Sequence, residues 1–332
     1  MVRFGVLGTA RIARQFLGKA LKNATIVAVA SREQRRADSF AGEFKVPRAY
    51  GSYDRLFLDP EIDAVYIPLP QHLHCEYTVK AARAGKHILV EKPSALTVAE
   101  LQKMMAACKE HGVLFMEAFM YRFMPIHQRV KELVASGLLG KVRYLDFNWC
   151  FNVKKLIRSP YRLDKSAGGG ALYDLGIYGV EFLRFITGGS PSLLSAYTSY
   201  ADAGGVDLFT HASFQIGEVF GAVTCGYTSD ANYYSISGEL GSLVVPGSVS
   251  GQYAEKVIQV HLHEGDARYE ERFPPVNPYT MEMEYFSECI EGGRTPIMDG
   301  ENSLRDLELL EEIFSRSVRM ELRPHLSRGG PG

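Results

Sequence analysis

The chain has 332 residues, with 37 Lys and Arg against 38 Asp and Glu, so its formal charge at pH 7 is −1. A hydrophobic content of 46% is enough for a sizeable core, and the length predicts roughly two domains. The balanced charge argues against nucleic-acid and membrane partners, and no apolar run approaches the ~20 residues of a membrane helix. Five dispersed cysteines, and a strand pattern that starts too early for a signal peptide, predict a cytoplasmic protein.

Apolar strand patterns alternate with helical patterns over the first third of the chain. We expect strands at 2–7, 25–30, 64–67, 87–90 and 113–118, with a further short segment at 48–50. Helices are expected at 10–22, 33–43, 72–84 and 97–111, the last opened by a capping box. Because strand–helix alternation is typical of βαβ units, the pattern predicts a parallel sheet with right-handed crossovers.

The rest of the chain has a different pattern. After a glycine-rich and aromatic helix at about 168–187, apolar runs recur with little helix between them. These runs lie at 192–200, 208–214, 219–227, 233–236, 242–245 and 257–262. Glycines between them indicate antiparallel hairpins, and helices at 278–291 and 302–320 close the chain. We divide the chain into a dinucleotide-binding domain (1–122), a substrate-binding and oligomerisation domain (123–325) and a disordered tail (326–332).

A degenerate dinucleotide-binding motif follows the first predicted strand. Gly8-Thr9-Ala10-Arg11-Ile12-Ala13 matches the fingerprint G-x-G-x-x-G with alanine at the second and third glycine positions. Small residues there permit a tight turn and let backbone N–H groups approach a pyrophosphate. The motif alone also suits an ordinary strand–helix turn, but its position at the first βα junction favours a dinucleotide site.

The residues after the second predicted strand bear on the choice between NADP and NAD. An NAD site usually has Asp or Glu there, which accepts a hydrogen bond from the ribose 2′-hydroxyl. Here the strand ends at Ser31 and Arg32, with Arg36 close behind, and guanidinium groups form charge-assisted bonds to phosphate. We therefore expect NADP(H). NAD(H) remains an alternative through Glu33, with the arginines then forming the solvated face of a charged helix.

One lysine and an aspartate–tyrosine pair are candidates for the reacting groups. Lys92 follows a predicted parallel strand, at the edge where ligands bind in such sheets. Asp174 and Tyr178 are four residues apart, so a helix places them on one face. A tyrosine with a pKa near 10 needs a cation to become a base, and Lys92 would lower that pKa. The spacing alone equally allows a surface lysine, a core tyrosine and a capping aspartate.

Five motifs occur in order along the chain. They are Gly8-x-Ala10-x-x-Ala13, Pro70-Gln71-His72-Leu73-His74, Ala84-Gly85-Lys86-His87, Glu91-Lys92-Pro93, and Gly168-Gly169-Gly170 followed by Asp174-x-Gly176-x-Tyr178. Together they resemble the glucose–fructose oxidoreductase/inositol dehydrogenase (Gfo/Idh/MocA) family over essentially the whole chain. The resemblance implies an α/β fold: an N-terminal Rossmann doubly wound parallel sheet and a C-terminal α/β domain with a large, mostly antiparallel open sheet. It also implies a homodimer or homotetramer formed through that second sheet.

The resemblance further implies which residues form the site. Lys92, Asp174 and Tyr178 become the catalytic residues, Tyr178 as proton donor or acceptor, and Tyr121 and Tyr161 join them as substrate contacts. The implied cofactor contacts are Gly8, Thr9, Ala10, Arg11, Ile12, Ser31, Arg32, Arg36, Leu69, Pro70, His72, His74, Glu91, Lys92, Arg122 and Arg162. Because inositol dehydrogenase-like members carry histidine at the position of Tyr178, the chain looks more like the branch of sugar ketoreductases and dimeric dihydrodiol dehydrogenase.

The resulting hypothesis is an NADP-dependent oxidoreductase that acts on CH–OH groups. It would transfer hydride between nicotinamide and a secondary alcohol or ketone carbon of a sugar, cyclic polyol or diol. The alternatives are a trans-dihydrodiol or xylose-type dehydrogenase of the same family, and a non-catalytic regulator that senses NADP. We expect no metal, because the histidine pairs at 72/74 and 261/263 lack a set of further ligands.

Overall fold

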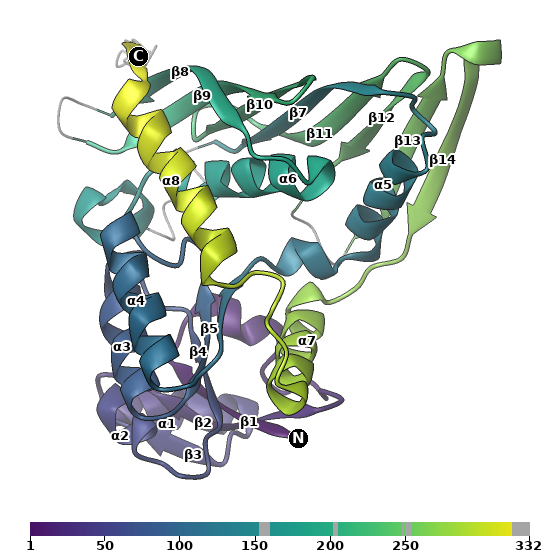
Figure 1. The fold of residues 1–332 in the computed structure, drawn as a ribbon. Helices are drawn as coiled ribbons and strands as arrows, with labels where there is room; N and C mark the ends of the chain where they lie inside the picture. Colours follow the sequence, from purple (N-terminus) through teal and green to yellow (C-terminus); the bar gives the residue numbers. More distant parts are fainter. Residues whose placement is uncertain (153–159, 202–204, 248, 250–253, 321–332) are drawn as a thin grey trace, which may run out of the picture.

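A computed structural model of the protein describes residues 1–152, 160–201, 205–247, 249 and 254–320. The tail at 326–332, which we expected to be disordered, lies outside the described residues. Two sheets organise the molecule, and they lie one above the other in Figure 1.

The first sheet has six parallel strands in the order β3-β2-β1-β4-β5-β6. This is the order of a doubly wound Rossmann sheet, so the predicted fold of the first domain is confirmed. The strands are β1 (Val2–Leu7), β2 (Ala24–Ala30), β3 (Arg48–Tyr50), β4 (Ala64–Ile67), β5 (His87–Glu91) and β6 (Phe115–Ala118). The helices between them are α1 (Gln34–Phe44), α2 (Tyr53–Phe57), α3 (His74–Arg83), preceded by the 3-10 turn η2 (Gln71–Leu73), and α4 (Val98–Glu110). Central strands are buried on both faces, which explains their continuous apolar sequences.

The expected helix at 10–22 is wrong. Only the 3-10 helix η1 (Arg11–Gln15) forms, and Gly18 (φ 72°) lies in the turn that follows. Helix α7 (Pro278–Gly292), from the far end of the chain, packs against β1 and β2 instead. Its N-cap Asn277 donates its side-chain N–H to the carbonyl of Gln15 at 2.7 Å. A segment from the far end of the chain thus covers the part of the sheet that the expected helix at 10–22 would have covered.

The second sheet has nine strands in the order β14-β13-β12-β11-β7-β10-β9-β8-β15. Two neighbouring pairs, β7/β10 and β8/β15, are parallel and the others are antiparallel, so the predicted mostly antiparallel sheet is confirmed. Six of its strands match the expected runs: β8 (Ser192–Tyr200), β9 (Asp207–Ile216), β10 (Val219–Gly226), β11 (Ala231–Gly238), β12 (Gly241–Pro246) and β13 (Lys256–Leu262). The sequence analysis missed β7 (Val142–Cys150), β14 (Ala267–Phe273) and β15 (Val318–Met320).

Helices cover the face of the second sheet that is turned toward the first domain. Helices α5 (Pro125–Ala135) and α6 (Ile177–Thr187) lie under it, and α8 (Gly300–Arg316) runs from its edge down to α4 (Figure 1). The other face carries no helix among the described residues. Exposed aromatic side chains on that outer face include Tyr144, Tyr197, Phe220 and Tyr233. Within the described chain, no helix combines the length and apolar character needed to span a bilayer.

The helix that carries Asp174 begins later than expected. Residues 168–170 form a turn instead, with Gly168 at φ 85° and Gly170 at φ 126°, values that favour glycine. The π-helix η7 (Leu172–Gly176) follows and continues directly into α6. π-Helical turns are rare and often occur at functional sites, so the irregular start draws attention to this segment.

Candidate active site

The sequence-predicted site residues gather at the carboxyl ends of the parallel strands. Gly8 follows β1, Ser31 follows β2, Leu69 follows β4 and Lys92 follows β5. This is the edge at which ligands bind in open α/β sheets. The glycine-rich turn before η7 approaches the same edge, because η2 contacts η6 (Lys165–Ala167).

The turn after β1 has the geometry of a dinucleotide-binding turn. Gly8 adopts φ 83°, and a Cβ there would lie 2.9 Å from Leu69 Cδ2. Its N–H donates to the carbonyl of Ala30 at 2.7 Å, which fixes the turn against β2. Thr9 and Ala10 are partly exposed beyond it. Only glycine fits at residue 8, and the backbone that follows is open to a ligand.

The segment after β2 offers free positive charge. Ser31 is buried and its N–H donates to the carbonyl of Tyr50 at 2.9 Å. Arg32 and Arg36 are exposed, and neither forms an ion pair with a described residue. Arg14, in contrast, pairs with Glu43. The two unpaired guanidinium groups fit an anionic ligand, as expected for a 2′-phosphate.

Lys92 and Asp174 meet across the domain boundary. Lys92 Nζ donates to the backbone carbonyl of Asp174 at 2.6 Å and to its Oδ1 at 3.3 Å. Asp174 Oδ2 accepts from Arg162 Nε at 2.6 Å and from the hydroxyl of Tyr227 at 3.1 Å. Arg162 also lies 5.1 Å from the ring centre of Tyr161. The site residues that the sequence selected from segments far apart are therefore neighbours.

These contacts keep Asp174 ionised in a buried place. Burial by itself raises the pKa of the carboxyl, but the charges of Lys92 and Arg162 and their hydrogen bonds hold that pKa below its usual value of 3.8. Asp174 in turn holds the Lys92 ammonium through its carbonyl and its carboxylate, and the Arg162 guanidinium through one bond to Oδ2. The cluster is a preorganised charge arrangement of the kind that active sites use.

Tyr178 lies beside Lys92, but not in the way that we expected. Lys92 Nζ is 4.8 Å from the centre of the Tyr178 ring, over its face, while the hydroxyl donates to Met120 Sδ at 3.7 Å. Burial raises the pKa of the phenol well above 10, and Tyr279, Glu91 and Asp174 add to the rise. The expected lowering of this pKa by Lys92 is therefore wrong for this arrangement. The phenol is neutral.

Two predicted ligand contacts share a partner on α6. The Tyr121 hydroxyl donates to Glu181, and its side chain is fully buried. Arg122 pairs with the same carboxylate and lies 4.1 Å from the ring centre of Phe185. Glu181 belongs to α6, which draws both side chains into the helix packing under the second sheet. The assignment of Tyr121 to substrate and of Arg122 to cofactor therefore stays a prediction, with Glu181 as the partner of both side chains in the structure.

His74, which the sequence predicts as a cofactor contact, is an internal residue. It is fully buried, with Nδ1 3.0 Å from the carbonyl of Pro93 and Nε2 2.7 Å from that of Leu69. Burial lowers its pKa to about 4. The imidazole therefore braces the loops after β4 and β5 against each other, whereas His72 is exposed at the loop surface. Glu91 accepts from the Tyr66 hydroxyl at 2.5 Å, so it too has a partner within the first domain.

Several residues of the site escaped the sequence analysis. Tyr227 bonds Asp174 directly, and Met120 receives the Tyr178 hydroxyl. Trp149 on β7 packs against Tyr178 with ring centres 4.9 Å apart. Leu145, Phe147 and Trp149 alternate along β7 and therefore lie on one face, and this period of two is visible in the sequence. No local signal identifies the partners at 120 and 227.

Other parts of the described chain offer weaker candidates. No three His, Cys, Asp or Glu side chains there come together to hold a metal ion. An open hollow of about 500 Å³ lies between β12 and β14, lined among others by Gln259, His261 and Arg268. None of the predicted site residues lines it, and its wall consists of side chains at the margin of the second sheet. The chemistry at the carboxyl edge of the first sheet is the better site.

Comparison with known proteins decides the family. Residues 2–119 match the model of the oxidoreductase family with an NAD-binding Rossmann fold, and residues 127–244 match the GFO/IDH/MocA C-terminal domain. An uncharacterised oxidoreductase of Rhizobium meliloti is 34% identical over 96% of this chain and 98% of its own. The chain belongs to the Gfo/Idh/MocA family. The resemblance inferred from the motifs is thereby confirmed.

Three similar proteins have named activities. A D-xylose 1-dehydrogenase (NADP(+)) of Haloferax volcanii is 33% identical over 94% of this chain and 96% of its own. Human trans-1,2-dihydrobenzene-1,2-diol dehydrogenase is 35% identical over 65% of this chain and 64% of its own. A 3-ketoreductase from Actinomadura kijaniata, crystallised with NADP and TDP-benzene, superposes with a TM-score of 0.86 at 26% identity, covering 97% of this chain and 99% of the other.

Proposed function

We propose that this chain is an NADP-dependent oxidoreductase that interconverts a secondary alcohol and a ketone on a sugar, cyclic polyol or diol. The observation that carries the proposal is the contact of Lys92 with Asp174 beside Tyr178, formed across the domain boundary at the carboxyl edge of the Rossmann sheet. Membership of an oxidoreductase family supports it.

The residues around the first two strands fit NADP. Gly8 and the open backbone after it would hold the pyrophosphate, and Ser31, Arg32 and Arg36 would hold the 2′-phosphate. NADP is bound in the Actinomadura ketoreductase and named for the Haloferax dehydrogenase, which supports the same choice here. When bound, the nicotinamide supplies or accepts the hydride.

In this proposal Tyr178 moves the proton of the reacting oxygen. A buried neutral phenol is a donor, so Tyr178 would protonate a carbonyl oxygen that is being reduced once its hydroxyl turns from Met120 to the substrate. The reverse step, oxidation of an alcohol, would start from the phenolate, which is the form that burial disfavours. An ammonium has three N–H donors, and Lys92 uses two of them on Asp174, which leaves the third for the substrate oxygen. Asp174 and Arg162 hold that ammonium in place.

A tyrosine substitution tests this role. We expect Tyr178→Phe to lower kcat by about 10² to 10⁴, the usual contribution of a general acid or base, while NADPH binding measured by calorimetry is retained. Tyr234→Phe is the matched control, because it removes a fully buried hydroxyl, which lies 2.9 Å from His127 Nδ1, at a residue that is not predicted to belong to the site. Activity is followed as NADPH absorbance with a panel of ketosugars, aldoses and diols. Near-normal turnover by Tyr178→Phe would contradict the role.

The cofactor preference has its own test. In the double variant Ser31→Ala/Arg32→Ala, loss of a charge-assisted bond should raise the KM for NADPH about tenfold to a hundredfold and leave the KM for NADH nearly unchanged. Equal effects on both would show that these residues do not read the 2′-phosphate. Binding of NADPH without turnover of any substrate in the panel would instead favour the regulator.

We also propose that the outer face of the second sheet joins copies of the chain. Exposed aromatic side chains there would be buried by a second copy. Sedimentation of the purified protein should show a dimer or tetramer, and a monomer at micromolar concentration would contradict this. The five described cysteines are all free and buried, which fits the reducing cytoplasm that we propose as its location.

A further inference from the structure

Asp207 lies behind the reacting residues, in a position that the proposed chemistry does not use. It is the first residue of β9 and only 2% exposed. Its Oδ2 accepts the backbone N–H of Leu172 at 2.7 Å, and the N–H of Ala171 and the side chain of Thr210 also bond the carboxyl group. The carboxylate therefore caps the N-terminus of the continuous helix formed by η7 and α6, where negative charge is favoured.

The turn that leads into this helix is shaped around the same carboxylate. Gly170 has φ 126°, and a Cβ on it would lie 2.1 Å from Asp207 Oδ1. The carbonyl of Gly170 accepts from the N–H of Asp174 at 3.1 Å and from the hydroxyl of Tyr227 at 3.0 Å. Because the Tyr227 hydroxyl also reaches Asp174 Oδ2, the cap and the Lys92 site share one hydrogen-bonded unit.

We propose that Asp207 is a positioning residue: its ionised carboxylate clamps the turn at 170–172 and thereby sets where the following helix presents Asp174 and Tyr178, and protonation loosens the clamp. A charge-assisted N–H···O⁻ bond is roughly twice as strong as a neutral one, so loss of the charge weakens every bond of the cap at once. The proposal rests on the proposed function for its kinetic part, but the clamp itself is a statement about structure.

The surroundings of Asp207 set the pH at which its carboxylate becomes protonated. Burial raises its pKa to about 6, against the lowering by the N–H donors and Thr210. The ionisable groups that face it are Tyr173 on η7, Tyr200 on β8, Cys225 on β10 and Tyr227 after β10, and the pKa of each is raised. All four stay neutral near pH 6, so Asp207 is the group among them that changes charge there.

The kinetic test compares three variants with the wild type, using NADPH and the best ketone of the panel. Wild-type kcat should fall in acid with a midpoint near pH 6. Asp207→Asn should lower kcat at pH 8 about tenfold, leave the KM for NADPH within twofold and abolish the acid limb. Thr210→Val removes one bond to the charged form and should shift the midpoint upward by about one pH unit. Asp63→Asn is the matched control and should keep the acid limb. Asp63 directly precedes β4 and accepts the backbone N–H of Arg3 at 2.8 Å, but it lies at the amino ends of the strands of the first sheet.

A second readout keeps the clamp separate from the chemistry. Hydrogen exchange measured by mass spectrometry should show faster exchange at 170–178 in Asp207→Asn than in Asp63→Asn. If Tyr178→Phe retains turnover, the proposed function fails while this exchange result still decides the clamp. An unchanged acid limb in Asp207→Asn, or unchanged exchange, overturns the proposal. If Asp207→Asn does not fold, Thr210→Val decides: an unshifted midpoint overturns it.

Discussion

Lys86 and Lys92 stand at opposite ends of the same strand, β5, and both are largely buried, yet their surroundings differ. Lys86 Nζ donates to the backbone carbonyls of Asp59 and Ile62 at 2.7 and 2.8 Å. Lys92 donates to a residue more than eighty positions away, in the other domain. One lysine closes a local loop, whereas the other joins two domains at the ligand-binding edge.

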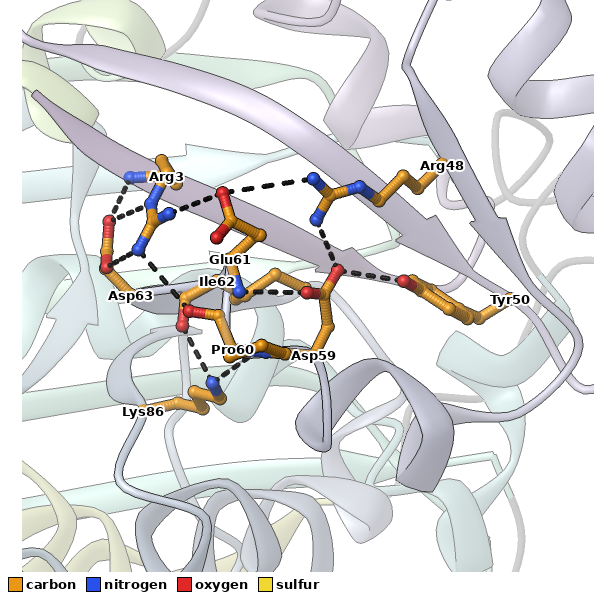
Figure 2. Close-up of polar contacts among 9 residues, drawn as sticks. All are labelled: Arg3, Arg48, Tyr50, Asp59, Pro60, Glu61, Ile62, Asp63 and Lys86. Carbon is orange, nitrogen blue, oxygen red and sulfur yellow. Dashed lines mark hydrogen bonds and ion pairs between the residues drawn. The ribbon is translucent and has the colours of Figure 1, made fainter.

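The polar network around Lys86 is self-contained (Figure 2). Asp63 accepts from Arg3, and Asp59 accepts from Arg48 at 2.7 Å and from the Tyr50 hydroxyl at 2.8 Å. All these residues belong to the Rossmann domain. Arg3 and Arg48 lie at the amino ends of β1 and β3, and Asp63 and Lys86 directly precede β4 and β5. Tyr50, the last residue of β3, joins them through its hydroxyl. Ligands of open parallel sheets bind outside the opposite, carboxyl ends of the strands. A buried lysine is therefore not evidence of a site by itself. Whether a buried lysine marks a site depends on its partners and on the end of the strands at which it lies.

The largest expected effect separates the two lysines by activity. Lys92→Met should lower kcat by about 10² to 10⁴, since it removes the proposed donor to the substrate oxygen and both hydrogen bonds to Asp174. Lys86→Met should leave kcat per folded molecule within about twofold. Equal losses of kcat in the two variants, measured with NADPH at saturating substrate, would show that the two lysines do not differ in their contribution to activity.

A smaller, opposite effect is expected in stability. Lys86→Met leaves two buried carbonyls, those of Asp59 and Ile62, without a donor, which should cost about 1 to 3 kcal/mol of unfolding free energy. Urea unfolding followed by circular dichroism measures the loss. Lys103→Met, at an exposed position of α4, serves as the control and should change the unfolding free energy little. A Lys86 variant as stable as this control would mean that the amino-edge network contributes nothing.

The smallest effect concerns acid stability. The hydrogen bonds and charge of Arg3 hold the pKa of Asp63 below its usual 3.8, despite partial burial. A lowered acid pKa in the folded state stabilises above the unfolded value, and this stability is lost as the pH falls through the folded value. Asp63→Asn should therefore be less stable at pH 7 but lose less further stability between about pH 4 and pH 2. A parallel loss in wild type and variant would contradict the assigned direction.

The predictable part of the fold is the part that local sequence encodes. Buried parallel strands are short apolar runs, so the positions of β1 to β6 along the chain could be predicted, whereas the doubly wound arrangement came from the family resemblance. The helix expected at 10–22 failed because α7, more than 250 residues away, supplies the packing that a local helix was assumed to provide. Strand β7 was overlooked because Arg143, Asp146 and Asn148 interrupt its apolar residues, although they alternate with them.

The residues that form the site were easier to predict than the protonation state and contacts of each. Motifs selected Lys92, Asp174 and Tyr178, and the structure brings them together. The same reasoning did not predict the contacts of Tyr121 and Arg122 with Glu181, because that partner lies about sixty residues away and no spacing reveals it. The protonation state of Tyr178 was also misjudged. Burial and the acids around it outweigh a single ammonium that lies over the ring and not at the hydroxyl.

The contact of Trp149 with Tyr178 has an optical consequence. Trp149 is the single tryptophan of the chain, so all indole fluorescence of the protein originates beside the ring of Tyr178. Tryptophan emission overlaps the absorption of reduced nicotinamide but not that of the oxidised form. The chain thus carries an intrinsic energy-transfer donor, and quenching of its emission would distinguish reduced from oxidised cofactor at the site without any label.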